Sequence, residues 1–131
     1  MTHRVFLDAN VLFSAAWLEG SGLGRLWRLP GTALVSSQVA VAEAERNLDS
    51  GEQRTRLQSL VARMALVEAP PRAALPAGVE LVAKDTPILL AAIEAGATQL
   101  LTRDRRHFGH LYGNSVSGVK VLMPAAYLRS L

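Results

Sequence analysis

Hydrophobic residues along this chain fall into short runs separated by longer stretches of mixed polarity. Four of the runs have the length of buried β-strands and lie at residues 5–7, 33–35, 99–101 and 119–122. The stretches between them space their apolar residues as helices do, which predicts helices over 12–17, 23–29, 37–48, from 51 onward and over 87–95. Residues 66–67 are predicted to form a further short strand, and Pro124 to begin a short terminal helix.

Residues with special backbone preferences indicate where the helices begin and end. Ser36 and Ser37 are candidate N-caps of the helix that follows the second strand. Thr86 is the predicted N-cap of the later helix, with Pro87 at its first position. Gly96 is predicted to end that helix, because glycine readily adopts the left-handed conformation found after helix ends.

The alternation of short apolar strands with helices predicts an α/β fold. We expect a three-layer α/β/α arrangement with a central parallel β-sheet, because helices that connect parallel strands cover both faces of the sheet. The chain has 131 residues, which suits one domain, predicted to span residues 1–131. Ligands of such sheets bind at the carboxyl ends of the strands. Polar residues that directly follow the strands are therefore the first candidates for a functional site.

Composition removes several classes of protein. Cysteine is absent, which excludes a disulfide scaffold, a thiolate metal site and a cysteine nucleophile. Charged residues interrupt every long apolar stretch, and the N-terminal residues do not have the pattern of a signal peptide. We therefore expect a cytoplasmic protein with no membrane partner. The formal net charge of +3 does not by itself identify a nucleic-acid-binding protein.

Acidic residues follow the predicted strands at matching positions. Asp8 comes directly after the first strand, Asp104 comes three residues after Leu101, and Asp85 lies at the start of a helix. If the strands are parallel, these carboxylates converge at one edge of the sheet. Carboxylates held close together repel one another unless a cation neutralises them, and oxygen-only clusters suit Mg²⁺ or Mn²⁺.

Each of these acids also has a purely structural interpretation. Asp8 and Asn10 could form a turn stabilised by the aspartate side chain. Asp85 could cap a helix, and Asp104 could be a solvated loop residue. These interpretations become less convincing because the acids occupy equivalent places in the predicted topology.

Several segments, taken in chain order, resemble the PIN-domain family. They are Phe-Leu-Asp-Ala-Asn-Val-Leu at 6–12, Glu-Ala-Glu-Arg-Asn-Leu at 43–48, Lys-Asp-Thr-Pro-Ile-Leu-Leu-Ala-Ala at 84–92, Leu-Leu-Thr-Arg-Asp at 100–104 and Gly-Val-Lys-Val-Leu at 118–122. Their order and spacing cover nearly the whole chain. The resemblance implies a metal-dependent ribonuclease with a central parallel sheet. Many small members of the family are toxins that a small antitoxin protein holds inactive, and many are homodimers.

The resemblance also implies which residues form the site. The acids that bind the metal, Mg²⁺ or Mn²⁺, and act on RNA would be Asp8, Glu43, Asp85 and Asp104. Asn10 and Thr102 match the polar residues that support such a site, and Thr102 is expected to orient a carboxylate through a hydrogen bond.

Two positions depart from the family pattern. Arg103 replaces the glycine often found between the threonine and the aspartate, and Arg106 stands where some toxins carry a further acid. The number of metal ions that four acids would bind is therefore left open. Asp8 and Asp104 are the strongest candidates for direct ligands, while Glu43 or Asp85 would hold a metal-bound water or act as a base.

The helix after Ser37 carries two glutamates, and the evidence for which one faces the site is divided. Helical periodicity sets the apolar face from Val41, Ala44 and Leu48, which brings Glu45 closer than Glu43 to the buried side. The family spacing points to Glu43, and we follow it. Glu45 is then expected at the surface, paired with an arginine.

Basic residues cluster beside Asp104. Arg103, Arg105 and Arg106 are expected to bind the phosphate backbone of the RNA substrate, and His107 to lie at the surface or contact phosphate. A solvated charged face is the alternative. The aromatic side chains fall within apolar patterns, which favours core or dimer packing over base stacking, for Phe6, Phe13, Trp17, Trp27 and Phe108.

Two functions other than a nuclease fit parts of the pattern. A receiver-type phosphorylation domain also gathers acids at strand ends, and Thr102 and Lys120 could serve as its threonine and lysine. It needs an aspartate on the middle strand, however, and none lies between Asp49 and Asp85. The second alternative is a PIN-like module that binds RNA or protein without catalysis.

Overall fold

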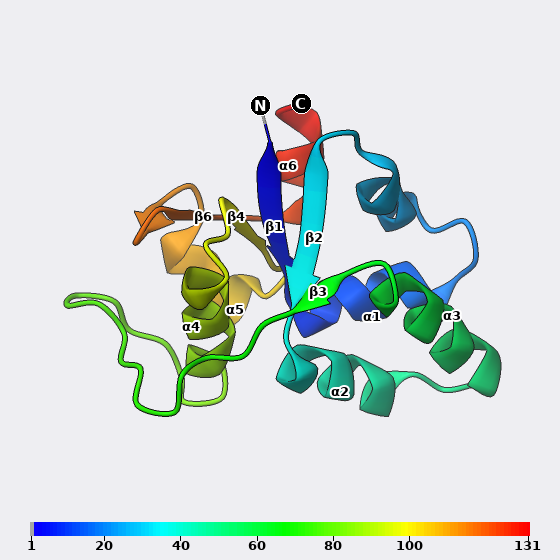
Figure 1. Cartoon of the computed structure of the whole chain (residues 1–131), viewed down its shortest axis with the longest axis horizontal. Helices are drawn as coiled ribbons and strands as arrows, with labels where there is room; N and C mark the ends of the chain where they lie inside the picture. Colours follow the sequence, from blue (N-terminus) through cyan, green and yellow to red (C-terminus); the bar gives the residue numbers. More distant parts are fainter. Residues whose placement is uncertain (1) are drawn as a thin grey trace.

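A six-stranded sheet forms the centre of the molecule in a computed structural model that describes residues 2–131 (Figure 1). Its strands lie in the order β3-β2-β1-β4-β6-β5. All neighbouring strands are parallel except β5 and β6, which are antiparallel at one edge. The strands are β1 (His3–Leu7), β2 (Thr32–Ser36), β3 (Ala65–Leu66), β4 (Gln99–Leu101), β5 (Ser115–Val116) and β6 (Val119–Leu122). The predicted α/β fold with a mostly parallel central sheet is confirmed.

Helices cover both faces of this sheet. They are α1 (Ala9–Trp17), the 3-10 helix η1 (Gly22–Arg28), α2 (Gln38–Asn47), α3 (Gly51–Val61), α4 (Thr86–Glu94), α5 (Arg105–Phe108), the 3-10 helix η2 (Gly109–Leu111) and α6 (Pro124–Arg129). The chain moves outward from β1 to β3 through α1, α2 and α3, and returns to β4 through α4. Because crossovers between parallel strands are right-handed, this reversal puts α4 on the opposite face (Figure 1). The arrangement is compatible with the predicted three layers.

The first strand organises the core. It lies between β2 and β4, and Val5, Phe6 and Leu7 are completely buried. A run of consecutive buried residues is typical of a strand with both faces covered. Burying side chains of this size stabilises a fold by about 1.5–3 kcal/mol each. At the other end of the chain, the Tyr127 hydroxyl of α6 lies 2.7 Å from His3 Nδ1, which attaches the C-terminal helix to the start of β1.

Strand register aligns the carboxyl ends of β1, β4 and β6. Leu7 pairs with Leu101, and Leu101 pairs with Leu122. The ladder continues by one residue, because the Asp8 amide donates to the Leu101 carbonyl over 3.1 Å. Asp8 and Thr102 therefore lie side by side at this edge, and the ends of the first and fourth predicted strands share it as the topological argument predicted.

Some local predictions were wrong. Asp85, not Thr86, is the N-cap of α4. The Thr86 hydroxyl donates instead to the Val82 carbonyl over 3.3 Å, which leaves it no capping role. The helix predicted at 23–29 is a 3-10 helix, and the sequence analysis missed α5, η2 and β5, which are too short for apolar periodicity to reveal.

Within residues 2–131, no helix combines the length and the apolar character that crossing a membrane requires.

Candidate functional site

Four acids from four different segments line one cleft of about 360 Å³. We call this set the acid cleft, formed by Asp8, Glu43, Asp85 and Asp104. Asp8 and Asp104 follow β1 and β4, Glu43 belongs to α2, and Asp85 precedes α4. The lining is completed by Ala9, Asn10, Phe13, Asn47 and Lys84. The structure thus brings together all four acids that the sequence singled out.

Asp8 is held by neutral hydrogen-bond donors. Its side chain is buried, with 4% of the residue exposed. Oδ1 accepts from the Ala9 amide over 2.7 Å, so Asp8 caps α1. Oδ2 accepts from the Thr102 hydroxyl over 2.8 Å and from Asn10 Nδ2 over 3.3 Å. Among the ion pairs found in residues 2–131, none involves Asp8, so its negative charge is buried without a cationic partner.

Thr102 connects both strand ends of the site. Its hydroxyl is fully buried, donates to Asp8, and accepts from Asn10 Nδ2 over 3.2 Å and from the Asp104 amide over 3.1 Å. Asn10 in turn accepts from the Arg103 amide over 2.8 Å. Thr102 therefore does orient a carboxylate, and it also fixes the start of the segment that carries Asp104.

Burial raises the pKa of the Asp8 carboxyl from its usual 3.8 to about 6. The hydrogen bonds from Thr102 and Ala9 oppose this shift, and the nearby negative charges of Glu43 and Asp85 add to it. Burial also raises the pKa of Asp85, against the opposing effects of His107 and Lys84. Both carboxyls therefore lose their protons less readily than they would in water. A bound cation would stabilise their negative charge.

His107 lies between two of the acids. Its Nδ1 is 2.9 Å from Asp85 Oδ2 and 2.9 Å from Asp104 Oδ2. His107 was expected at the surface or in contact with phosphate, and the structure adds that its Nδ1 is buried and faces the two carboxylates. Its position three residues after Asp104 was the available signal, since residues three apart in a helical turn are neighbours.

The donor set fits a divalent cation. One ligand atom from each of Asp85, Asp104 and His107 lies within 4.8 Å of the other two, while Asp8 and Glu43 line the same cleft outside this group. Mg²⁺ and Mn²⁺ accept carboxylate oxygen and imidazole nitrogen to different degrees. Buried Asp85 Oδ2 has no hydrogen-bond partner. His107 Nδ1 lies 2.9 Å from this oxygen but without suitable hydrogen-bond angles, so a bound cation would stabilise the oxygen further.

The two glutamates of α2 point to different surfaces. Glu43 is half-buried and lines the acid cleft. Glu45 is exposed and lines a separate hollow with Arg46 and Arg54. The expected ion pair of Glu45 with an arginine is not among those in residues 2–131, and Arg54 Nε donates instead to its backbone carbonyl over 3.3 Å.

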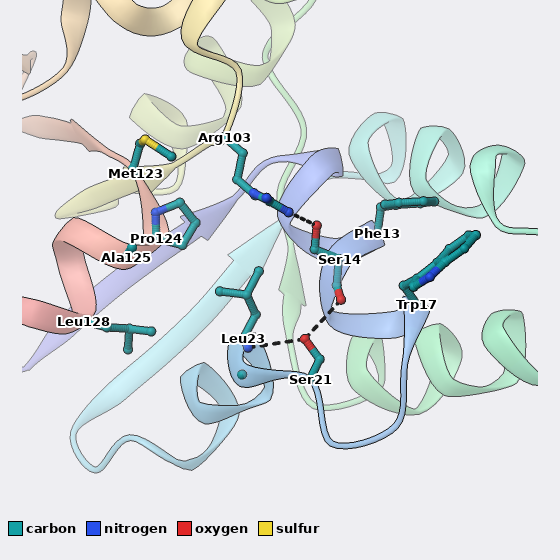
Figure 2. Close-up of a pocket in the computed structure, with 11 residues that line it drawn as sticks. Phe13, Ser14, Trp17, Ser21, Leu23, Arg103, Met123, Pro124, Ala125 and Leu128 are labelled. Carbon is teal, nitrogen blue, oxygen red and sulfur yellow. Dashed lines mark hydrogen bonds between the residues drawn. The ribbon is translucent and has the colours of Figure 1, made fainter.

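The three arginines after Thr102 diverge. Arg103 extends toward α1, where it donates to the Ser14 hydroxyl (Figure 2). Arg105 Nε contacts the sulfur of Met123 over 3.4 Å, and Arg106 lines a different hollow with Glu80 and His110. They therefore do not form one basic patch, and Lys84 contributes a basic side chain to the acid cleft itself.

An apolar groove of about 700 Å³ adjoins the acid cleft (Figure 2). Leu23, Leu128 of α6 and Arg103 are among the residues that line the groove. Phe13 lines both the groove and the acid cleft. It is half-buried and packs on Trp17 with ring centroids 5.1 Å apart. The remaining aromatic residues considered above are buried in the core, as expected, namely Phe6, Trp27 and Phe108.

Comparison with known proteins finds no family model and no curated protein that matches this chain. The PIN-domain resemblance is therefore carried by the quoted segments alone, and function has to be inferred from the acid cleft.

We predict that burial of the Asp8 carboxylate without a cationic partner makes the free energy of unfolding of the metal-free protein depend on pH. The Asp8 carboxyl keeps its proton to higher pH in the folded state than in the unfolded state. The contribution of protonated Asp8 to the free energy of unfolding is therefore complete below pH 3.8 and is lost as pH rises through about 6. In EDTA, the free energy of unfolding of the wild type relative to Asp8→Asn should fall by about 2 kcal/mol between about pH 4 and pH 7.

Denaturant unfolding at each pH measures this difference, with Asp49→Asn as the control at an exposed aspartate. A difference between wild type and Asp8→Asn that stays constant across this range would contradict the prediction.

Proposed function

We propose that this protein is a divalent-metal-dependent endoribonuclease that hydrolyses phosphodiester bonds in RNA. The observation that supports it is the convergence of Asp8, Glu43, Asp85 and Asp104 in one cleft at the carboxyl edge of the sheet. So many carboxylates in one cleft repel each other, and Lys84 and His107 do not balance them. The choice of RNA as substrate comes from the PIN-domain resemblance.

In the proposed mechanism, Asp8 and Asp104 would be direct ligands of Mg²⁺ or Mn²⁺. A bound divalent cation supplies a water of lowered pKa and stabilises negative charge on the phosphate. Thr102 and Asn10 keep Asp8 Oδ2 in place by hydrogen bonds, so little reorganisation is needed when the substrate binds. Half-buried Glu43 lines the acid cleft and is the proposed acceptor of a proton from the attacking water, with Asp85 as the alternative.

The biological setting that we propose also follows from the resemblance. The protein would act in the cytoplasm, where its RNA substrate is found, as the toxin of a toxin–antitoxin pair. A small antitoxin protein would be its partner, and the nuclease would be a homodimer. These proposals depend on the nuclease assignment, and the acid cleft supports only that first step.

The receiver-type alternative has less support. Lys120 pairs in the sheet with Gln99, two residues before the carboxyl end of β4, and is not part of the acid-cleft lining. The third strand in chain order, β3, would have to carry the required aspartate. It consists only of an alanine and a leucine and lies at the edge of the sheet. A non-catalytic PIN-like module would share the geometry of the site, so only an assay separates it from an enzyme.

The proposed function predicts cleavage that requires a divalent metal. Structured and unstructured RNA should be cut with Mg²⁺ or Mn²⁺ and remain intact in excess EDTA. Asp8→Asn should lower the rate at least about 100-fold, because it removes charge that holds the cation while keeping the shape of the side chain. Circular dichroism checks the fold of the variant.

Cleavage that survives chelation, or full activity of Asp8→Asn, would refute the mechanism. RNA that is bound but never cut under any metal condition would instead indicate the non-catalytic module.

The geometry of α2 predicts different roles for its two glutamates. Glu43→Gln should slow cleavage about 100-fold at saturating metal, the lower end of the usual contribution of a general base. Glu45→Gln is the matched control, two residues away on the same helix, and should retain the wild-type rate. An inactive Glu45→Gln together with a normal Glu43→Gln would overturn the assignment.

Substrate binding can be divided among the arginines. Arg103 is expected to contribute most, because it lines the groove that adjoins the acid cleft while Arg105 and Arg106 reach other surfaces. In an Asp8→Asn background, Arg103→Ala should weaken RNA binding for all sequences and reduce the salt slope by about 1.

The double variant Arg105→Ala/Arg106→Ala is the comparison for this test. If it weakens binding as much as Arg103→Ala, the original expectation for all three arginines holds. An unchanged salt slope in every variant would show that these residues form a solvated face.

A further inference from the structure

We infer that His107, together with Asp85 and Asp104, forms a cation site of mixed nitrogen and oxygen ligands that prefers Mn²⁺ to Mg²⁺. One ligand atom from each of the three residues lies within 4.8 Å of the other two. The inference rests on the proposed function for the two acids, which belong to the acid cleft. It adds the imidazole as a ligand and a consequent choice of metal.

His107 Nδ1 lies between two carboxylates, 2.9 Å from one oxygen of each. These contacts are ion pairs when the imidazole is protonated. Asp85 Oδ2 and His107 Nδ1 are both buried, and neither makes a hydrogen bond with the angles that one requires. A single proton on Nδ1 could in any case serve only one of the two carboxylates. A cation among the three atoms would satisfy all of them.

Asp85 supplies the independent sign of a ligand. Only 8% of this residue is exposed, and it makes no side-chain hydrogen bond to the α4 helix that it precedes. Its free Oδ2 faces Asp104 and His107. A buried carboxylate oxygen usually finds a donor in the protein, because leaving it unpaired is destabilising by about 1–3 kcal/mol.

The backbone around Asp104 positions the other two ligands. Asp104 caps α5 with Oδ1, which accepts from the His107 amide over 3.0 Å, and this leaves Oδ2 for the cluster. The next residue, Phe108, is completely buried and anchors the helix in the core. The imidazole therefore projects from a fixed turn toward the start of α4.

The ligand types decide which metal is preferred. Mg²⁺ binds oxygen ligands in a nearly ideal octahedron and retains several waters. Imidazole suits the first-row transition metals, and Mn²⁺ accepts both carboxylate and imidazole. Replacing one oxygen by nitrogen in this cluster thus favours Mn²⁺ over Mg²⁺.

Pulsed electron paramagnetic resonance of Mn²⁺ bound to tag-free protein tests the inference without RNA. The wild type should show hyperfine coupling of Mn²⁺ to ¹⁴N, and labelling of histidine with ¹⁵N should convert it to ¹⁵N coupling. His107→Gln should abolish the coupling and weaken Mn²⁺ binding by about tenfold or more, with a smaller effect on Mg²⁺. Calorimetric titration measures both affinities.

His110→Gln is the matched control. His110 is exposed and lies 2.8 Å from the Glu80 carbonyl, so this variant should retain both the coupling and the affinity. Absence of histidine coupling in the wild type would overturn the inference, even if His107→Gln failed to fold. Coupling that persists in a folded His107→Gln would also overturn it.

The spectroscopic test of the cation site and the cleavage assay of the proposed function can give different results. Nitrogen coupling in a protein that cuts no RNA would support the cation site and count against the nuclease. Metal-dependent cleavage without nitrogen coupling would support the nuclease and overturn the proposed cation site.

Discussion

The parallel pairing of β1 with β4 is the constraint on which the candidate site depends. It aligns Leu7 with Leu101, so the next residues along each strand meet at the same edge of the sheet. Asp8 then receives a hydrogen bond from Thr102, although 94 residues separate the two in the chain. The strands themselves are held by completely buried apolar side chains, which makes this edge a rigid support. A carboxylate supported in this way is positioned before any ligand arrives.

The acid cleft gathers like charges in a place where water screens them poorly. Burial raises the pKa of both Asp8 and Asp85, and neighbouring acids add to both shifts. The metal-free protein is therefore less stable at neutral pH than it would be without this cluster. Such an arrangement is typical of functional sites, where local stability is given up for binding or catalysis. The hydrogen bond from Thr102 only partly offsets the cost of burying the negative charge of Asp8.

The two sides of the cleft are built differently. Around Asp8, neutral donors satisfy a buried carboxylate and hold it in one orientation. Around Asp85, a carboxylate oxygen and an imidazole nitrogen approach closely without satisfying each other. On the first side both carboxylate oxygens accept hydrogen bonds although the charge has no cationic partner, whereas on the second side a buried oxygen also lacks a hydrogen bond. This contrast is the physical reason for assigning an imidazole ligand to only one side.

The sequence alone determined the longer helices, four of the strands, the sheet class and the placement of Asp8 and Asp104 after strands, because these follow from local periodicity and from the chirality of crossovers. Tertiary structure decided where side chains point. Helix α2 buries Ala40 and Ala44, whereas the more hydrophobic Val41 had turned the predicted face toward Glu45. The meeting of His107 with Asp85 likewise depends on how α5 docks beside the start of α4. Such orientations are set by packing between segments distant in the chain, which local sequence patterns do not encode.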